Sequence, residues 1–65
     1  MLYELARRDE NGLVVRLLWD RRRDQAVIRY RDRTNGEAFV ADVPNPKALA
    51  AFRHPNVYRP AGLAA

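Results

Sequence analysis

The chain lacks the side chains on which most catalytic and metal-binding sites depend. It contains no cysteine and no serine, and it has one histidine, His54, and one threonine, Thr34. Disulfides and thiolate metal sites are therefore excluded, and so are Ser-His-Asp and Cys-His catalytic arrangements within one chain. A site with several histidine ligands is excluded as well. We expect a protein that is not an enzyme and that binds no metal or other cofactor.

Glycine is also scarce, which bears on phosphate and substrate sites. Gly12, Gly36 and Gly62 lie far apart, so no glycine-rich phosphate loop is present. Asp32 and Glu37 are predicted to close one hairpin loop side by side. A solvated loop neither raises a carboxyl pKa much nor shelters a substrate. We therefore predict a structural role for this pair and no small-molecule substrate.

Long apolar segments are missing too. No apolar run approaches the roughly 18 residues that a membrane span requires. Residues 1–5 have no basic stretch before an apolar core, unlike a signal peptide. The sequence predicts a cytoplasmic protein that does not associate with a membrane.

What is present indicates one small globular domain. The chain has 65 residues, of which 48% are hydrophobic, and this length allows a single domain. Because it has neither disulfides nor a metal, such a chain depends on good packing or on self-association.

Turn signals divide the first 43 residues into four extended segments, 2–8, 13–20, 25–32 and 37–43. A period of two places Leu13, Val15, Leu17 and Trp19 on one face of the second segment, and Ala26, Ile28 and Tyr30 on one face of the third. Antiparallel pairing must bring these sets together, because a slip of one residue would turn a whole set into water. The predicted pairs are Trp19–Ala26, Leu17–Ile28 and Val15–Tyr30, continued by Phe39, Ala41 and Val43 beside Tyr30, Ile28 and Ala26.

The first segment is predicted to be a strand, with a short helix as the alternative. Placing Leu5 opposite Leu17 and Tyr3 opposite Trp19 extends the apolar face. This pairing needs a three-residue loop, 10–12, with Gly12 in the left-handed bulge position.

A short helix is predicted after the fourth segment. Asn45 is a good N-cap, Pro46 suits the first helical position, and Pro55 ends the helix before His54. Leu49 and Phe52 would share the face that packs on the sheet. His54 at the helix end has an imidazole suited to a free carbonyl. Val57 and Tyr58 are expected to pack back on the core.

Together these elements predict an α+β fold, a small antiparallel meander of three to four strands with one C-terminal helix packed on one face. We expect a single domain over residues 1–58 and a flexible tail over residues 59–65. The most buried side chains are expected to be Leu17, Trp19, Ile28, Phe39, Leu49 and Phe52.

The second face of this sheet is the candidate functional surface. The register places Arg16 opposite Arg29, Val14 opposite Arg31 and Leu18 opposite Val27, with Val40 nearby. Exposed together, these aliphatic side chains would mark an interface. The candidate residues, with three loop arginines included, are Arg16, Leu18, Val27, Arg29, Arg31, Val40, Arg21, Arg22 and Arg23.

Two kinds of partner fit this surface, and a bare solvated face is the third alternative. The net charge of +4, with Lys47 as the only lysine among 12 basic residues, suits phosphate or carboxylate recognition. The preference for arginine over lysine also fits the codon composition of a GC-rich genome. Aspartates lie among the arginines and no aromatic shares their face, which disfavours single-stranded nucleic acid. We therefore expect an interaction module that binds a protein partner or a second copy of itself. The alternative is DNA or RNA binding.

Three stretches carry a family resemblance. Leu17-Leu18-Trp19, the turn from Thr34 to Phe39, and the run from Ala48 to Pro55 resemble small uncharacterised proteins of high-GC Gram-positive bacteria. In that group a Trp-ended strand, a Thr-Gly-Glu-like turn and an Ala-Leu-x-x-Phe-x-His-Pro ending recur. The resemblance covers roughly residues 13–58 and implies one compact domain, with no activity to carry over.

Overall fold

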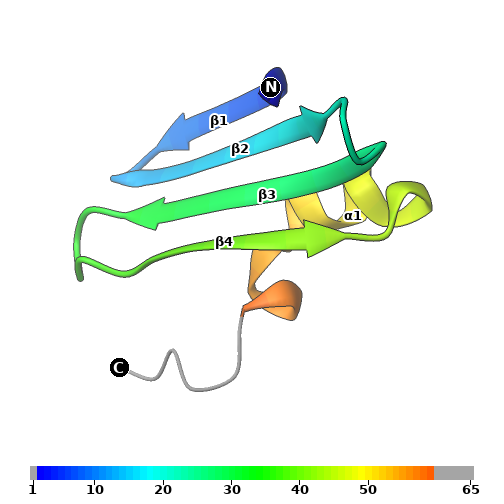
Figure 1. The fold of residues 1–65 in the computed structure, drawn as a ribbon. Coiled ribbons are helices and arrows are strands. Elements are labelled where there is room, and N and C mark those ends of the chain that lie inside the picture. Colours follow the sequence, from blue (N-terminus) through cyan, green and yellow to red (C-terminus); the bar gives the residue numbers. More distant parts are fainter. Residues whose placement is uncertain (1, 60–65) are drawn as a thin grey trace.

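Four antiparallel strands follow one another across the sheet in the order of the chain. The computed structural model describes residues 2–59. It contains β1 (Leu2–Glu10), β2 (Leu13–Asp20), β3 (Gln25–Asp32) and β4 (Ala38–Val43). A 3-10 turn, η1 (Asn45–Lys47), leads into α1 (Ala48–Arg53), and a second, η2 (Pro55–Tyr58), follows. Figure 1 shows α1 against one side of the sheet, here called the helix face, and the opposite side is the open face. The predicted α+β meander with one C-terminal helix is confirmed.

The register of the three later strands is the predicted one. β2 pairs with β3 through Trp19–Ala26, Leu17–Ile28 and Val15–Tyr30. β3 pairs with β4 through Tyr30–Phe39, Ile28–Ala41 and Ala26–Val43. The four-residue loop before β4 ends at Gly36, whose φ of 76° is the positive value that the sequence predicted there.

The core lies between the helix face and α1. Val15, Ile28 and Val43 are fully buried, and the rings of Tyr30 and Phe39 stack with centroids 4.8 Å apart. From the helix, the fully buried residue is the small Ala51. Because residues at i, i+3 and i+4 share a helix face, Ala48 and Phe52 pack beside Ala51.

Three of the six predicted core residues differ from expectation. Leu49 is 64% exposed, since the contact face of α1 runs through Ala48, Ala51 and Phe52 rather than through Leu49. Trp19 and Phe52 are only half-buried at the rim of the core. Leu17, Ile28 and Phe39 are buried as predicted.

β1 is a strand, so the alternative of a short helix is wrong, but its predicted register needs correction. Asn11 and Gly12 form a two-residue turn with φ of 53° and 81°, and Glu10 lies opposite Leu13. This turn geometry matches the right-handed twist of the strands and favours Asn-Gly. Counting from this turn, Ala6 rather than Leu5 lies opposite Leu17, and the register then shifts between Glu4 and Ala6. Tyr3 lies opposite Trp19 as predicted.

Asn45 does not serve as the predicted N-cap. Its side chain instead accepts a hydrogen bond from the backbone N–H of Ala26 and donates one to the carbonyl of Asp24, both 2.8 Å long. Pro44 occupies the cap position and makes no side-chain cap bond. Asn45 thus holds the loop between β2 and β3 against the chain that enters the helix.

The chain after α1 returns to the sheet. The helix ends at Arg53, before His54-Pro55, as predicted. Tyr58 packs on the core, whereas Val57, expected to do the same, is 74% exposed. The Arg59 guanidinium lies 5.6 and 5.7 Å from the ring centres of Tyr30 and Phe39. The rest of the predicted tail, residues 60–65, lies outside the described residues. Within residues 2–59, no helix has the length and apolar character that a membrane crossing requires.

Truncation of Ile28 and of Leu49 should distinguish the core seen in the structure from the core expected from the sequence. Ile28→Ala should lower the free energy of unfolding by about 2–5 kcal/mol, because Ile28 is fully buried. Leu49→Ala should change it by no more than about 0.5 kcal/mol, because Leu49 is mostly exposed. Urea unfolding followed by circular dichroism measures both values. Equal losses from the two substitutions would contradict this core.

Candidate functional site

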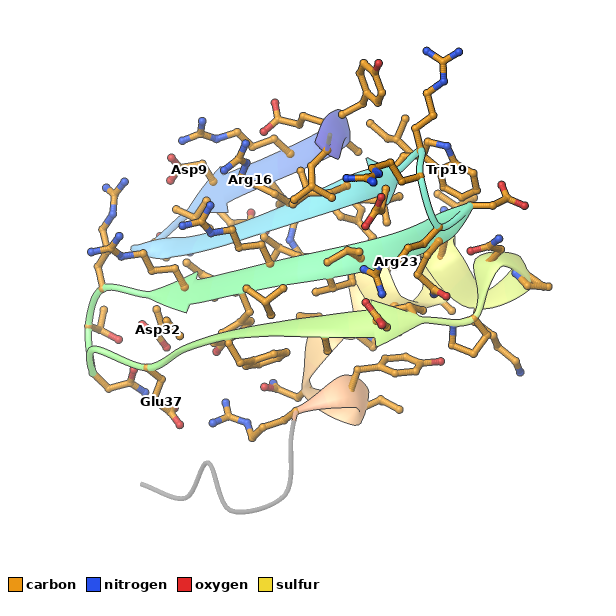
Figure 2. The ribbon with its side chains drawn as sticks, viewed as in Figure 1. Asp9, Arg16, Trp19, Arg23, Asp32 and Glu37 are labelled. Atoms are coloured by element: carbon orange, nitrogen blue, oxygen red, sulfur yellow. The ribbon has the colours of Figure 1, made fainter. Side chains whose placement is uncertain are left out.

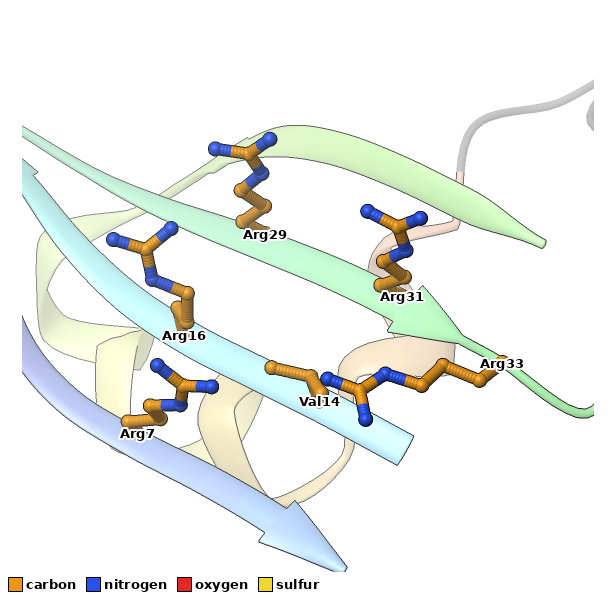
Figure 3. Close-up of a pocket in the computed structure, with 6 residues that line it drawn as sticks. All are labelled: Arg7, Val14, Arg16, Arg29, Arg31 and Arg33. Carbon is orange, nitrogen blue, oxygen red and sulfur yellow. The ribbon is translucent and has the colours of Figure 1, made fainter. Parts of the chain in front are cut away.

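Five arginines converge on the open face around a single aliphatic side chain. Arg7 comes from β1, Arg16 from β2, Arg29 and Arg31 from β3, and Arg33 from the loop before β4. They line a hollow whose floor includes Val14. Figure 3 shows Arg33 extending back along the sheet toward Val14, while Arg16 and Arg29 stand on neighbouring strands. These five residues are called the arginine cluster below.

The strand register brings the cluster together. Arg16 lies opposite Arg29, Val14 opposite Arg31, and Arg7 opposite Arg16, so the cluster spans three adjacent strands. The N–H of Arg33 donates a 2.8 Å hydrogen bond to the carbonyl of Gly12, which ties the loop before β4 to the turn between β1 and β2. The cluster therefore stands on strands and on a braced loop.

The cluster has more positive charge than its own carboxylates balance. Arg16 Nε lies 2.6 Å from Glu4 Oε1, and Arg7 lies 3.3 Å from Asp9. Among residues 2–59, Arg29, Arg31 and Arg33 make no ion pair. Like charges directly opposite each other on a sheet repel. The cluster is therefore a site that an added anion would stabilise.

The size of the hollow limits the ligand. Its volume is about 170 Å³, whereas pockets that enclose small molecules measure roughly 300–1,000 Å³. A ligand of ordinary size would therefore lie mostly outside the hollow. No group of three or more metal-ligating side chains occurs within residues 2–59.

Three of the four aliphatic side chains on the open face are buried, contrary to the expectation from the sequence. Leu18 and Val27 are 3% and 2% exposed and Val14 is 7% exposed, whereas Val40 is 59% exposed. Ion pairs flank the buried pair on both sides, since Glu4 lies opposite Leu18 and Asp42 lies opposite Val27. Long arginine stems readily cover apolar surface while their charged ends stay in water.

Arg23 makes the ion pair on the β4 side of the buried residues Leu18 and Val27. It donates to Asp20 Oδ2 at 2.6 Å and reaches across to both oxygens of Asp42 at 2.8 and 3.1 Å. Figure 2 shows Arg23 over the end of the sheet, well away from Asp32 and Glu37. These hydrogen bonds lower the pKa of both Asp20 and Asp42 and raise the pKa of Arg23.

Asp32 and Glu37 each hold a part of the loop before β4, with separate partners. The hydroxyl and N–H of Thr34 both donate to Asp32 Oδ1, and these bonds lower the pKa of Asp32. Glu37 pairs with Arg59, whose pKa it raises, and accepts a hydrogen bond from Asn35. Each carboxylate therefore holds its own part of the loop.

The candidate residues divide into four groups. Arg16, Arg29 and Arg31 belong to the arginine cluster, Leu18 and Val27 are buried, and Val40 is exposed on β4. Arg21 and Arg22 are exposed in the loop between β2 and β3, where Arg23 is held by its two aspartates.

Arg7 was not among the candidates, because the expected register put it opposite Val15 on the helix face. The two-residue turn places it opposite Arg16 instead. The Asn11-Gly12 pair is the signal that would have found it, since this pair favours a two-residue turn. Arg33, expected at the end of the sheet, also joins the cluster.

Comparison with protein-family models, with curated proteins and with solved structures finds no match.

The two aspartates held by Arg23 should make stability depend on acid pH. Their pKa values are lowered from the ordinary 3.8 in the folded protein. The pairing therefore stabilises the fold above pH about 4 and is lost as the pH falls through the lowered values. Between pH 7 and pH 2, the urea midpoint of Arg23→Gln should fall less than that of the unaltered protein.

The control for this measurement is Arg21→Gln, which removes a neighbouring exposed arginine that makes no ion pair within residues 2–59. Its urea midpoint should fall with acid as much as that of the unaltered protein. Identical acid losses in all three proteins would show that Arg23 does not bind these aspartates in solution.

Proposed function

We propose that this protein is a cytoplasmic, non-enzymatic binding module whose arginine cluster holds the phosphate backbone of double-stranded nucleic acid. The observation that carries the proposal is the set of three arginines, Arg29, Arg31 and Arg33, that make no ion pair within residues 2–59. A guanidinium group is a planar fork that binds phosphate oxygens in pairs, which suits this chemistry.

A polymeric ligand fits the layout better than a free anion. The arginines are spread over three strands and a loop rather than pointed into one enclosed pocket. Duplex nucleic acid presents phosphates at regular intervals along its surface, and each phosphate contact releases a counterion. An open sheet face with several separate guanidinium groups can engage several phosphates at once.

A duplex fits better than a single strand. Proteins that bind single strands stack bases on aromatic side chains. Tyr30, Phe39, Trp19 and Phe52 belong to the core on the helix face, or pack against it. Tyr3 lies opposite Trp19 on that same face. Within residues 2–59 the arginine cluster thus has no aromatic platform beside it, and its contacts are suited to the backbone.

A protein partner, which the sequence favoured, is the second candidate. Val40 at 59% exposure adjoins Arg29, which lies opposite it, and arginine beside an exposed aliphatic group suits an acidic protein surface. Its support is weaker, because Leu18 and Val27 are buried and do not form the apolar anchor that such an interface uses.

Salt dependence distinguishes these candidates. Fluorescence anisotropy with a labelled DNA duplex of arbitrary sequence should show binding whose log–log slope against salt is about −0.9 for each phosphate contacted. Arg29→Ala should weaken binding and flatten the slope by about one unit. Failure to bind the duplex would overturn this proposal and leave an acidic protein partner as the candidate.

The matched control is Arg53→Ala, which removes the same charge from the last turn of α1, on the other side of the sheet. It should leave the salt slope nearly unchanged. If Arg53→Ala weakens duplex binding as much as Arg29→Ala, attraction to net charge is responsible and the arginine cluster is not the site.

A further inference from the structure

The two edges of the sheet differ in how they are protected. β4 is six residues long and is followed directly by Pro44, and short strands and prolines both discourage pairing at an edge. β1 is nine residues long and exposes three apolar side chains, Leu2, Tyr3 and Leu5, at 50%, 41% and 58%. A long edge strand with exposed apolar residues is a template for another strand.

The outward-facing backbone groups of β1 follow from its register. Opposed residues in an antiparallel ladder alternate between hydrogen-bonded and non-bonded pairs, and Glu10–Leu13 flanks a two-residue turn as a bonded pair. Counting from there, Arg7 and Asp9 direct their N–H and C=O groups away from β2. By the same alternation, the backbone groups of Leu17 bond to β1 and those of Leu18 bond to β3. Glu4 lies opposite Leu18, so the N–H and C=O groups of Glu4 also point away from β2.

We propose that β1 pairs antiparallel with β1 of a second copy of this chain, with Glu4 opposite Arg7 of the second copy. This register matches the outward-facing groups of Glu4 and Arg7, and it places Leu2 opposite Asp9 of the second copy. It also places the open faces of the two sheets on the same side of the dimer. Glu4 and Arg7 both lie on the open face, opposite Leu18 and Arg16 of β2.

Charge favours this register over its neighbour. A shift of two residues would place Glu4 opposite Asp9 of the second copy, and like charges directly opposite each other are destabilising. In the proposed register two Glu–Arg pairs form by symmetry. The bulge at Leu5 lies at the symmetry axis and interrupts both strands equally, so the spacing from Glu4 to Arg7 is the same in each copy.

The pairing has a geometric consequence. It joins two four-stranded sheets edge to edge, with both arginine clusters on one face and both helices on the other. The interaction does not depend on nucleic acid, since it uses the backbone and side chains of β1 alone. Its test is therefore independent of the test of duplex binding.

Cross-linking tests the position of the axis. The natural chain has no cysteine, so Leu5→Cys introduces a single thiol beside the axis. Under mild oxidation we expect a covalent dimer on a non-reducing gel. The control, Val40→Cys, places an equally exposed thiol on the open face of β4 and should cross-link far less. Equal cross-linking of the two variants would overturn the proposal.

Sedimentation equilibrium of the unaltered protein tests the association itself and should show a concentration-dependent dimer. Leu5→Asp should raise its dissociation constant at least about tenfold, because two carboxylates meet at the axis. Leu5 is 58% exposed, so the fold should survive, and circular dichroism checks this. A strict monomer throughout the unaltered protein's concentration range would overturn the proposal.

A charge exchange tests the register. Arg7→Glu places a carboxylate opposite Glu4 of the second copy, and Glu4→Arg places an arginine opposite Arg7, so each change alone should weaken the dimer. The double variant restores opposite charges and should recover most of the association. The exchange also alters the pairs that Glu4 and Arg7 make within one chain, so circular dichroism must show that each variant keeps its fold. A double variant weaker than both single variants would exclude this register.

Discussion

The pairing of β2 with β3 is the constraint on which the other features of the structure depend. Leu17 and Ile28 lie opposite each other in the core at 4% and 0% exposure, and a slip of one residue would turn both into water. The same register necessarily places Arg16 opposite Arg29 on the open face. The apolar pattern of one face thus determines the repulsive contact on the other, and Glu4 relieves it on one side only.

The sequence predicted those elements whose register is set by a clear apolar pattern, and it was less successful where two residues compete for one position. The strands from Leu13 to Val43 each have one apolar set, so their register follows from period and turn lengths. β1 has no such unique set, because Leu5 and Ala6 compete for the place opposite Leu17, and the Asn11-Gly12 turn decides for Ala6. In the same way, Leu49 is the larger side chain, but the close approach of α1 to the sheet favours Ala51.

The candidate site could be predicted only in part, because periodicity assigns a residue to a face but not its exposure. Arg16, Arg29 and Arg31 were placed correctly by alternation alone. The burial of Leu18 and Val27 depends on where long side chains run, and no local pattern contains that information. Arg23 reaches Asp42 at a sequence distance of 19 residues, across β3. Because Asp42 lies opposite Val27, this contact stands beside the apolar residues on which a protein interface was expected.

The arginines of this chain divide by what they contact, and the division bears on why arginine is so abundant. Arg23 bridges two carboxylates and Arg59 lies over two stacked rings, and both tasks need the planar guanidinium group. Arg29, Arg31 and Arg33 have no such contact within residues 2–59, so the fold does not explain them. Codon composition alone would account for arginine in place of lysine, but not for five positive charges gathered on one face. Gathered like charges cost stability in a domain this small, and the anionic partner that we propose would offset that cost.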